Sequence, residues 1–335
     1  MSRITILGAG AWGTALAVNL ANRGGHSVSL WSRSPQAATE MREHSENARY
    51  LPGFALPQTV TITADANRAI DEAEIVVTVI PSEHLRATYE HFAPLLRAGQ
   101  LIVSATKGIE DQTLLRMSEV IHQKLTEQSL DLPVGVLSGP SFAHEVAAGS
   151  PTALTIASTN SALASKVQRE FSGTTLRLYT NDDVVGVELG GALKNVIAIA
   201  SGIVTGLGLG HNTAAALITR GIAETTRLAV ACEGRRETLA GLSGIGDLVL
   251  TCTGALSRNR TVGIELGKGR QLNEILEGLN GKVAEGVRTT FAAVGLAKKH
   301  GIEMPITEQM AAILSAKKSP PEAIRELMAR PGRDE

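Results

Sequence analysis

Aromatic residues and cysteines are scarce in this chain. Phe, Trp and Tyr together make up 3% of its 335 residues, so we expect a core of Ala, Val, Ile and Leu side chains. The two cysteines, Cys232 and Cys252, are too few for a disulfide framework. Their low number favours a reducing, cytoplasmic setting.

Long apolar runs are missing as well, and neither sign of charge is in excess. No stretch of about 18 uncharged apolar residues occurs, so the sequence predicts no membrane span. The N-terminal run Ile4–Leu7 is too short for a signal peptide. Lys and Arg total 32 and Asp and Glu total 33, for a net charge of −1. This balance argues against a nucleic-acid partner, but it leaves room for a local basic pocket that binds a small anion.

Glycine, in contrast, is abundant. The chain has 34 glycines, which is about 10% of its residues, where an average protein has about 7%. Hydrophobic residues make up 43%, which is enough for a buried core and excludes intrinsic disorder as the main state. At roughly 100–200 residues per domain, the length predicts about two domains.

The first half of the chain alternates short apolar runs with helical patterns. The expected strands are residues Arg3–Leu7, Ser27–Trp31, Val60–Thr63, Ile75–Ile80, Leu101–Ser104, Val134–Leu137, Leu154–Ala157 and Leu176–Tyr179. Helical patterns between them include Ala11–Arg23, Ser82–Leu96 and Leu114–Thr126. Continuous apolar runs are typical of strands that are buried on both faces, as in parallel sheets. This half is therefore predicted to be an α/β domain with a doubly wound, Rossmann-type sheet.

The pattern changes after about Asn181. Asp182 and Asp183 are typical helix-starting residues, and no convincing strand follows them. The helical stretches are Val185–Ile203, Asn212–Glu233, Val262–Leu266, Leu272–Leu279, Arg288–His300, Thr307–Leu314 and Pro321–Met328. We therefore expect a dinucleotide-binding domain of residues 1–185 and an all-helical domain of residues 186–335.

A glycine-rich fingerprint joins the first expected strand to the first helix. The residues are Gly8-Ala9-Gly10-Ala11-Trp12-Gly13, which match G-x-G-x-x-G. Gly8 allows a tight turn, Gly10 lets the backbone approach a pyrophosphate, and Gly13 lets the helix pack closely on the strand. The alternative is an ordinary glycine-rich turn. The position between a strand and a helix favours dinucleotide binding.

The end of the second expected strand indicates the type of dinucleotide. An NAD site usually carries an acidic residue there, which binds the ribose 2′-hydroxyl. The sequence Leu30–Pro35 has no acid, and Arg33 is placed to pair with a 2′-phosphate. We therefore expect NADP(H) to be favoured over NAD(H). The alternative is that Arg33 is a solvated surface residue.

Two lysines are candidates for the proton transfer that accompanies hydride transfer. Lys194 lies among apolar and small residues in a helical pattern, where a lone lysine is costly unless it is functional or paired. The alternative is that the Lys194 side chain extends to the surface. Lys107 directly follows an apolar strand, and ligands of open α/β sheets bind beyond such strand ends. The alternative there is an exposed loop lysine.

Two further segments combine glycine with polar residues. Ser138–Phe142 follows a strand and precedes a helix, so its N–H groups are suited to an anion. In the helical half, Asp247 suits a hydroxyl or an ammonium, and the Ser257–Arg260 stretch suits a phosphate. Helix capping by Ser141 and Asp247 is the alternative. Residues with the spacing of a metal site are absent from the sequence, and Cys252 is interpreted as a small core residue rather than a nucleophile.

Together these segments resemble the bacterial-type NAD(P)-dependent glycerol-3-phosphate dehydrogenases over nearly the whole chain. The matching segments are Gly8–Ala17, Ala105–Glu110, Ser138–Ala143, Glu188–Asn195, Gly244–Leu248 and Ser257–Asn259. Each is modest alone, but their order and spacing also fit. The one departure is Ala11, where many relatives have Ser. The resemblance implies a C-terminal all-α domain like that of 6-phosphogluconate dehydrogenase.

The resemblance also implies a reaction and residue roles. The reaction is the reversible reduction of dihydroxyacetone phosphate by NAD(P)H to sn-glycerol 3-phosphate, which supplies phospholipid synthesis. Lys194 corresponds to the catalytic proton donor and acceptor. The residues that correspond to the family's substrate contacts are Lys107, Gly139, Ser141, Lys194, Asp247, Ser257, Arg258 and Asn259. The residues that correspond to the family's cofactor contacts are Gly8, Gly10, Ala11, Trp12, Gly13, Arg33, Lys107, Ala143, Arg258, Val283 and Glu285.

Two other functions stay open on the residues alone. A β-hydroxyacid or sugar-nucleotide dehydrogenase would also pair a Rossmann domain with a helical one, although the oxidising sugar-nucleotide type needs a catalytic cysteine motif. A non-catalytic NADP(H)-binding regulator would need the fingerprint but not Lys107, Lys194, Asp247 and Arg258. The oligomeric state, for which a homodimer is one option, is also open.

Overall fold

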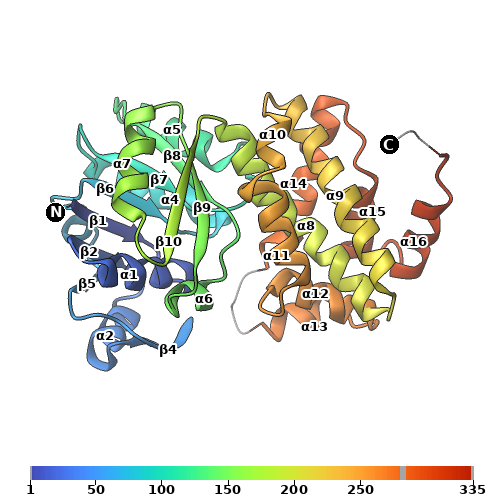
Figure 1. Cartoon of the computed structure of the whole chain (residues 1–335), viewed down its shortest axis with the longest axis horizontal. Coiled ribbons are helices and arrows are strands. Elements are labelled where there is room, and N and C mark those ends of the chain that lie inside the picture. Colours follow the sequence, from blue (N-terminus) through green and yellow to red (C-terminus); the bar gives the residue numbers. More distant parts are fainter. Residues whose placement is uncertain (1, 280–283, 333–335) are drawn as a thin grey trace. The chain divides into compact units, whose positions relative to one another are not determined.

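The computed structural model describes residues 2–279 and 284–332. The chain divides into two compact units, which Figure 1 colours along the sequence. Unit 1 comprises Met1–Lys107 and Arg116–Glu188, and unit 2 comprises Gly108–Leu115 and Leu189–Glu335. The domain boundary expected after residue 185 lies in the same helix, α8 (Val184–Gly206), as this change of unit. The sequence did not predict that Gly108–Leu115 belongs with unit 2.

Unit 1 is built on an eight-stranded sheet, and all eight expected strands are confirmed. The strands are β1 (Ser2–Leu7), β2 (His26–Trp31), β5 (Val60–Thr63), β6 (Ile75–Thr78), β7 (Leu101–Ser104), β8 (Val134–Ser138), β9 (Thr152–Ala157) and β10 (Leu176–Asn181). Their order is β10-β9-β8-β7-β6-β1-β2-β5. The sheet grows in one direction from β1 through β2 and in the other from β6 through β8, so its topological switch point lies between β1 and β6.

The sheet is parallel from β5 to β8, but it is not parallel throughout. β9 pairs with β8 in the antiparallel direction, with Ser138 opposite Thr155, and β10 follows β9 in parallel. The connection that joins β8 to β9 contains the short helix α6 (Ala143–Ala147). The sheet is therefore mixed rather than parallel throughout, which the sequence did not predict.

Helices cover both faces of this sheet, as a doubly wound fold requires. The helices of unit 1 are α1 (Ala11–Arg23), α2 (Pro35–His44), α3 (Ala66–Ile70), α4 (Ser82–Phe92), the 3-10 turn η1 (Ala93–Leu95), α5 (Met117–Glu127), α6 and α7 (Ser161–Phe171). α1 and α7 pack on the face that presents Leu30 and Val77. On the opposite face, Tyr89 of α4 bonds Thr78 at 2.8 Å, because successive strand residues alternate between faces.

The expected helix Leu114–Thr126 begins later than predicted. Leu114 has a φ of +60°, in the left-handed region, and α5 starts at Met117. The helix starts there because the carboxylate of Glu188 accepts hydrogen bonds from the Ser118 N–H at 2.8 Å and the Ser118 hydroxyl at 2.6 Å. Arg116 adds an ion pair to Glu188 at 2.6 Å. Buried Glu188 therefore fixes the start of α5 against the first turn of α8.

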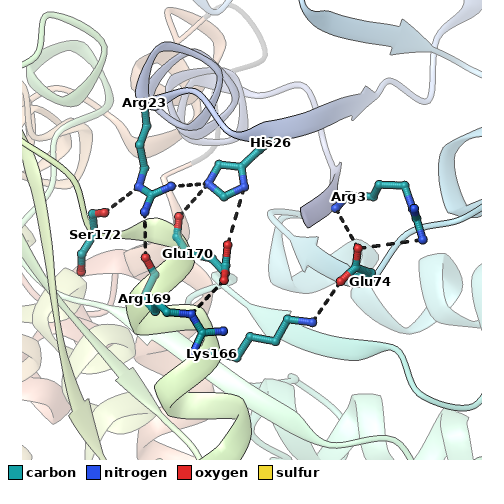
Figure 2. Close-up of polar contacts among 8 residues, drawn as sticks. All are labelled: Arg3, Arg23, His26, Glu74, Lys166, Arg169, Glu170 and Ser172. Carbon is teal, nitrogen blue, oxygen red and sulfur yellow. Dashed lines mark hydrogen bonds and ion pairs between the residues drawn. The ribbon is translucent and has the colours of Figure 1, made fainter. Parts of the chain in front are cut away.

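A network of polar side chains lies at the edge of the sheet where the parallel strands begin (Figure 2). Arg23, at the end of α1, donates to the carbonyl oxygens of Ser172 at 2.6 Å and of Arg169 at 2.9 Å, at the end of α7. Lys166 of α7 pairs with Glu74, next to β6, at 3.1 Å. These contacts join α1 and α7 at the edge remote from the glycine-rich fingerprint.

From Leu189 onward, the described residues form helices and their connecting loops, with no strand, as predicted. Besides α8, the helices of unit 2 are α9 (His211–Ala231), α10 (Arg236–Leu239), α11 (Asp247–Thr253), α12 (Arg258–Gly267), α13 (Leu272–Glu277), α14 (Glu285–His300), α15 (Pro305–Leu314) and α16 (Pro320–Met328). α8 is initiated as expected: the carboxylate of Asp183 accepts a hydrogen bond from the Gly186 N–H at 2.8 Å. The π-helical turn η2 (Leu242–Gly246) was not predicted.

The close packing of α8 on α12 depends on paired glycines. A Cβ on Gly202 would overlap the carbonyl oxygen of Arg260, and a Cβ on Gly206 would overlap that of Ile264. On α12, a Cβ on Gly263 would overlap the Ile199 carbonyl oxygen. The glycines Gly202 and Gly206 lie on successive turns of α8, and Gly263 and Gly267 on successive turns of α12, so the two backbones meet without side chains between them. Part of the excess glycine therefore serves helix packing.

The segment Gly108–Leu115 packs on α14. Asp111 forms an ion pair with Arg288 at 3.5 Å. Leu114 covers Gly295, where a Cβ would lie 3.2 Å from a Leu114 methyl carbon. Within the segment, the Leu114 N–H donates to the Glu110 carbonyl oxygen at 2.9 Å. It is therefore an integral part of the helical unit.

Among the described residues, α8 is long and apolar enough to cross a membrane, and the bent pair Arg236–Thr253 and Arg258–Gly267 passes the same test as one span. The side chains of the apolar window in α8 are fully buried by the rest of the chain. α8 thus has the properties of a central core helix.

Candidate active site

The β1–α1 turn has the geometry that the glycine fingerprint requires. Gly8 has a φ of +120°, and a Cβ there would overlap the Val79 carbonyl oxygen. A Cβ on Gly13 would overlap the carbonyl oxygen of Gly8. These two glycines therefore serve the tight turn and the close contact between helix and strand.

Gly10 is different, because no described atom lies within 4 Å of the position that its Cβ would occupy. It is the N-cap of α1, and no side chain caps the N–H groups of that helix. An open glycine at an uncapped helix N-terminus is the environment that a pyrophosphate needs. The residues present fit a dinucleotide at this turn.

The other candidate residues of unit 1 follow strand ends at the same edge. Arg33 is exposed after β2, and half-buried Lys107 follows β7. Gly139, with a φ of +139°, follows β8, and Ala143 begins α6. Because β1, β2, β7 and β8 run in the same direction, their carboxyl ends lie at one edge. This is the edge at which ligands bind in open α/β sheets.

Ser141 does not cap the following helix. Its hydroxyl donates to the Gly139 carbonyl oxygen at 3.1 Å, and the residue preceding α6 is Phe142. Ser141 instead stabilises the loop after β8.

In unit 2, the side chain of Lys194 on α8 is buried and paired. Its Nζ donates to the carboxylate of Asp247, the first residue of α11, and to the hydroxyl of Thr251 at 2.8 Å. The Thr251 hydroxyl in turn donates to the Asp247 carbonyl oxygen at 2.6 Å. Lys194 is 8% exposed and Asp247 is fully buried. The structure thus excludes both a lysine that extends into solvent and an Asp247 that serves only as a cap.

The residue next to Lys194 organises a second set of contacts. The Asn259 amide group donates to the Asn195 side-chain oxygen at 2.9 Å and accepts from the Gly286 N–H at 3.0 Å. A Cβ on Gly286 would lie 2.6 Å from the Asn195 carbonyl oxygen, so only glycine allows this approach. Asn259 therefore joins α8, α12 and the start of α14.

The remaining candidates of unit 2 lie at helix starts. Ser257 caps α12, accepting a hydrogen bond from the Arg260 N–H at 3.2 Å, and Arg258 follows it with an exposed side chain. Glu285 begins α14. Val283 lies outside the described residues. Cys252 is buried, and burial raises the pKa of its thiol to about 12, so the interpretation as a core residue is confirmed.

Two contacts of this site were not predicted. Thr251 was given no role, although it lies four residues after Asp247 and such residues share one face of a helix. Asn195 was part of a quoted motif without a role of its own. The helical spacing of Asp247 and Thr251 was the available signal in the first case.

A doubly wound sheet with a dinucleotide turn, followed by a helical unit with a buried lysine–carboxylate pair, defines the class of two-domain nicotinamide-dependent dehydrogenases. Comparisons with known proteins identify the family within this class. Residues 3–164 match the model of the NAD-dependent glycerol-3-phosphate dehydrogenase N-terminus, and residues 183–325 match that of the C-terminus.

Individual relatives agree with the family models. The chain is 63% identical to the glycerol-3-phosphate dehydrogenase (NAD(P)+) of Acidobacterium capsulatum, with all of both chains covered. It is 59% identical to that of Koribacter versatilis, over 100% of this chain and 99% of the relative. The crystal structure of glycerol-3-phosphate dehydrogenase from Coxiella burnetii has a TM-score of 0.93 and 42% identity, covering 98% of this chain and 99% of the other. The chain belongs to the NAD-dependent glycerol-3-phosphate dehydrogenase family.

Proposed function

We propose that this chain catalyses the reversible NAD(P)H-dependent reduction of dihydroxyacetone phosphate to sn-glycerol 3-phosphate. The observation that carries the proposal is the buried cluster of Lys194, Asp247 and Thr251 in a member of this family. A buried ammonium group held by a carboxylate is suited to polarising a carbonyl oxygen and giving it a proton.

Unit 1 would hold the dinucleotide. The uncapped start of α1, reached past Gly10, would bind the pyrophosphate. The exposed guanidinium of Arg33 would pair with a 2′-phosphate, which favours NADP(H) over NAD(H). Further contacts are proposed for Gly8, Ala11, Trp12, Gly13, Lys107, Ala143, Arg258 and Glu285, and for Val283 outside the described residues.

When bound, the nicotinamide supplies the hydride that reduces the carbonyl carbon. Lys194 orients the carbonyl oxygen and transfers the proton that the new alkoxide needs. Asp247 and Thr251 hold the ammonium in place, so that little reorganisation is required during the reaction. In the oxidative direction, Lys194 accepts the proton of the secondary hydroxyl.

The substrate phosphate would be bound by Arg258, whose guanidinium is exposed at the start of α12. Ser257 and Asn259, which flank it, and Lys107, Gly139 and Ser141 of unit 1 complete the proposed set. A bound phosphate group uses its binding energy to orient the carbonyl, so positioning contributes strongly to the rate.

We further propose a cytoplasmic enzyme that supplies glycerol 3-phosphate for phospholipid synthesis. The low number of cysteines, which favours a reducing environment, supports this setting. A homodimer is the assembly proposed for the oligomeric state.

The test is the oxidation of NADPH, followed by absorbance, in the presence of dihydroxyacetone phosphate. Dihydroxyacetone, which lacks the phosphate, is the matched control substrate. We expect rapid oxidation with the phosphorylated ketone and little with the control. Turnover of a β-ketoacid in its place would favour the β-hydroxyacid dehydrogenase, and NADPH binding without any turnover would favour a regulator.

A further inference from the structure

A β-hairpin outside the main sheet carries a buried amide that contacts the dinucleotide turn. The hairpin consists of β3 (Glu46–Asn47) and β4 (Leu51–Ala55). The Asn47 side-chain nitrogen donates to the carbonyl oxygen of Ala9 at 2.9 Å and to the hydroxyl of Thr14 at 2.8 Å. Asn47 is 4% exposed. Its amide therefore bonds to Ala9 within the fingerprint of residues 8–13 and to Thr14 directly after it.

The orientation of this amide is determined by its hydrogen bonds. The Asn47 side-chain oxygen accepts from the Tyr50 N–H at 3.3 Å, which places the NH₂ group toward Ala9 and Thr14. A flipped amide would bring its oxygen against the Ala9 carbonyl oxygen, and the two acceptors would repel each other. Asn47 thus acts on the turn as a donor.

The contact with Ala9 has a consequence for the next N–H group. In a planar trans peptide, the C=O and the following N–H point in opposite directions. Cis peptides are absent from the described chain, so the Gly10 N–H points away from Asn47 when the Ala9 carbonyl points toward it. Gly10 is the residue with open space at its Cβ position, at the uncapped start of α1.

Glycines on both sides make this peptide unit easy to rotate. Gly8 and Gly10 flank Ala9, and glycine permits backbone conformations that other residues avoid. Such a unit needs an external hydrogen bond to hold one orientation. The hairpin is anchored well enough to provide it, because Leu51 and Phe54 pack on Ala15 and Trp12 of α1 and on Val146 of α6.

We infer that Asn47 is a positioning residue for the dinucleotide pyrophosphate. By fixing the Ala9–Gly10 peptide, it presents the Gly10 N–H to the phosphate before the dinucleotide binds. The inference rests on the proposed function, because it assumes that this turn binds NAD(P)H. It assigns to the hairpin a role in cofactor affinity rather than in the chemical step.

The experiment measures NADPH affinity by fluorescence titration, without substrate, for the wild type and two variants. Asn47→Ala removes the donor and leaves the peptide free to rotate. Asn47→Asp keeps the shape but places an acceptor against the Ala9 carbonyl, which favours the rotated peptide. We expect NADPH binding to weaken about tenfold in Asn47→Ala, as for the loss of one hydrogen bond, and more in Asn47→Asp. With saturating NADPH, kcat and the KM for dihydroxyacetone phosphate should stay near wild type.

Glu46→Ala is the matched control. It removes the acceptor of the Gly53 N–H, a 2.8 Å hydrogen bond within the hairpin, and leaves the Asn47 amide in place. It should therefore lower hairpin stability without weakening NADPH binding. Unchanged affinity in both Asn47 variants would overturn the inference, and so would an equal loss in Glu46→Ala. If one Asn47 variant does not fold, the other and the control still decide the matter. A wild type that binds no dinucleotide would instead contradict the proposed function.

Discussion

The ammonium group of Lys194 lies against the carboxylate of Asp247, and both groups are buried in the helical unit. Thr251, one helical turn after Asp247, bonds to the same ammonium at 2.8 Å. A buried ion pair of this kind is weak evidence for stability, because the cost of removing both charges from water offsets their attraction. The pair therefore fits the catalytic role proposed for Lys194 better than a role in stability.

Replacement of Lys194 should therefore affect the chemical step. Lys194→Ala is expected to lower kcat by about 10²–10⁴, the usual contribution of a positioned proton donor. NADPH should still bind, because unit 1 holds the dinucleotide turn. Steady-state kinetics and a fluorescence titration measure the two effects. Lys166→Ala, which removes a lysine paired with Glu74 on unit 1, is the control and should keep its kcat. A normal kcat in Lys194→Ala would contradict the catalytic role proposed for Lys194.

Arg33 should determine the preference between the two dinucleotides. Arg33→Asp is expected to weaken NADPH binding by at least about tenfold, because it replaces a charge-assisted hydrogen bond with repulsion of the 2′-phosphate. NADH has no 2′-phosphate, so its affinity should hold or improve. Paired titrations with both dinucleotides measure the change in the same variant. Equal losses of affinity for NADH and NADPH would show that Arg33 does not bind the 2′-phosphate.

The glycine contact between α8 and α12 should be sensitive to a single methyl group. Gly202→Ala places a Cβ against the backbone of Arg260 and Gly263, which cannot give way without separating the helices. We expect the free energy of unfolding to fall by about 1–3 kcal/mol, as for an overpacked core, despite the better helix propensity of alanine. Chemical denaturation measures this change in the free energy of unfolding. Gly278→Ala is the control, since its added Cβ meets nothing closer than 3.4 Å. Equal stability of the two variants would contradict this packing.

The pH dependence of stability should include a contribution from His26. Burial, and then the positive charge of Arg23, lower the pKa of His26 below its usual 6.5. Its Nε2 lies 2.7 Å from Arg23 and 2.9 Å from the Glu170 carbonyl oxygen (Figure 2). The folded state therefore binds the proton less readily than the unfolded chain does. The stability contributed by neutral His26 is present above about pH 6.5 and is lost as the pH falls from there through the folded-state pKa.

Denaturation measured between about pH 5 and 8 in the variant His26→Asn tests this linkage. The acid-side loss of unfolding free energy should be smaller in the variant than in the wild type. His84→Asn is the control, because the His84 side chain is 47% exposed. A variant with the wild-type slope would rule out His26 as the titrating group.

Much of the fold could be predicted because its signals are local. Continuous apolar runs marked the buried strands, and Gly8, Gly10 and Gly13 marked the turn. A Cβ on Gly8 or Gly13 would clash with the backbone, whereas the space at Gly10 is open. Lys194 was recognisable because a lysine in an apolar helix needs a partner. Asp247 was interpreted as suited to an ammonium, and its pair with Lys194 confirms this. The sequence did not establish that pair in particular, because Asp247 is distant from Lys194 in the chain.

Features that depend on long-range contacts were missed. The β3–β4 hairpin contains Pro52 and Gly53, which are poor strand formers, and it is held in place by packing on α1 and α6. The role proposed for Asn47 depends on its contact with Ala9, and no local sequence pattern predicts that contact. The antiparallel direction of β9 was also missed, because the apolar composition of a strand does not specify the direction in which it pairs.

The segment Gly108–Leu115 bears on how this gene can be divided or recombined. In the sequence it lies between the two stretches that form unit 1, yet it belongs to unit 2, where Asp111 and Leu114 contact α14. A fragment that ends at residue 188 would carry these side chains without their partners, and a fragment that starts at residue 189 would leave Arg288 and Gly295 uncovered. A single cut in α8 therefore does not separate the two units. Recombination between relatives at this boundary must also exchange the eight residues Gly108–Leu115.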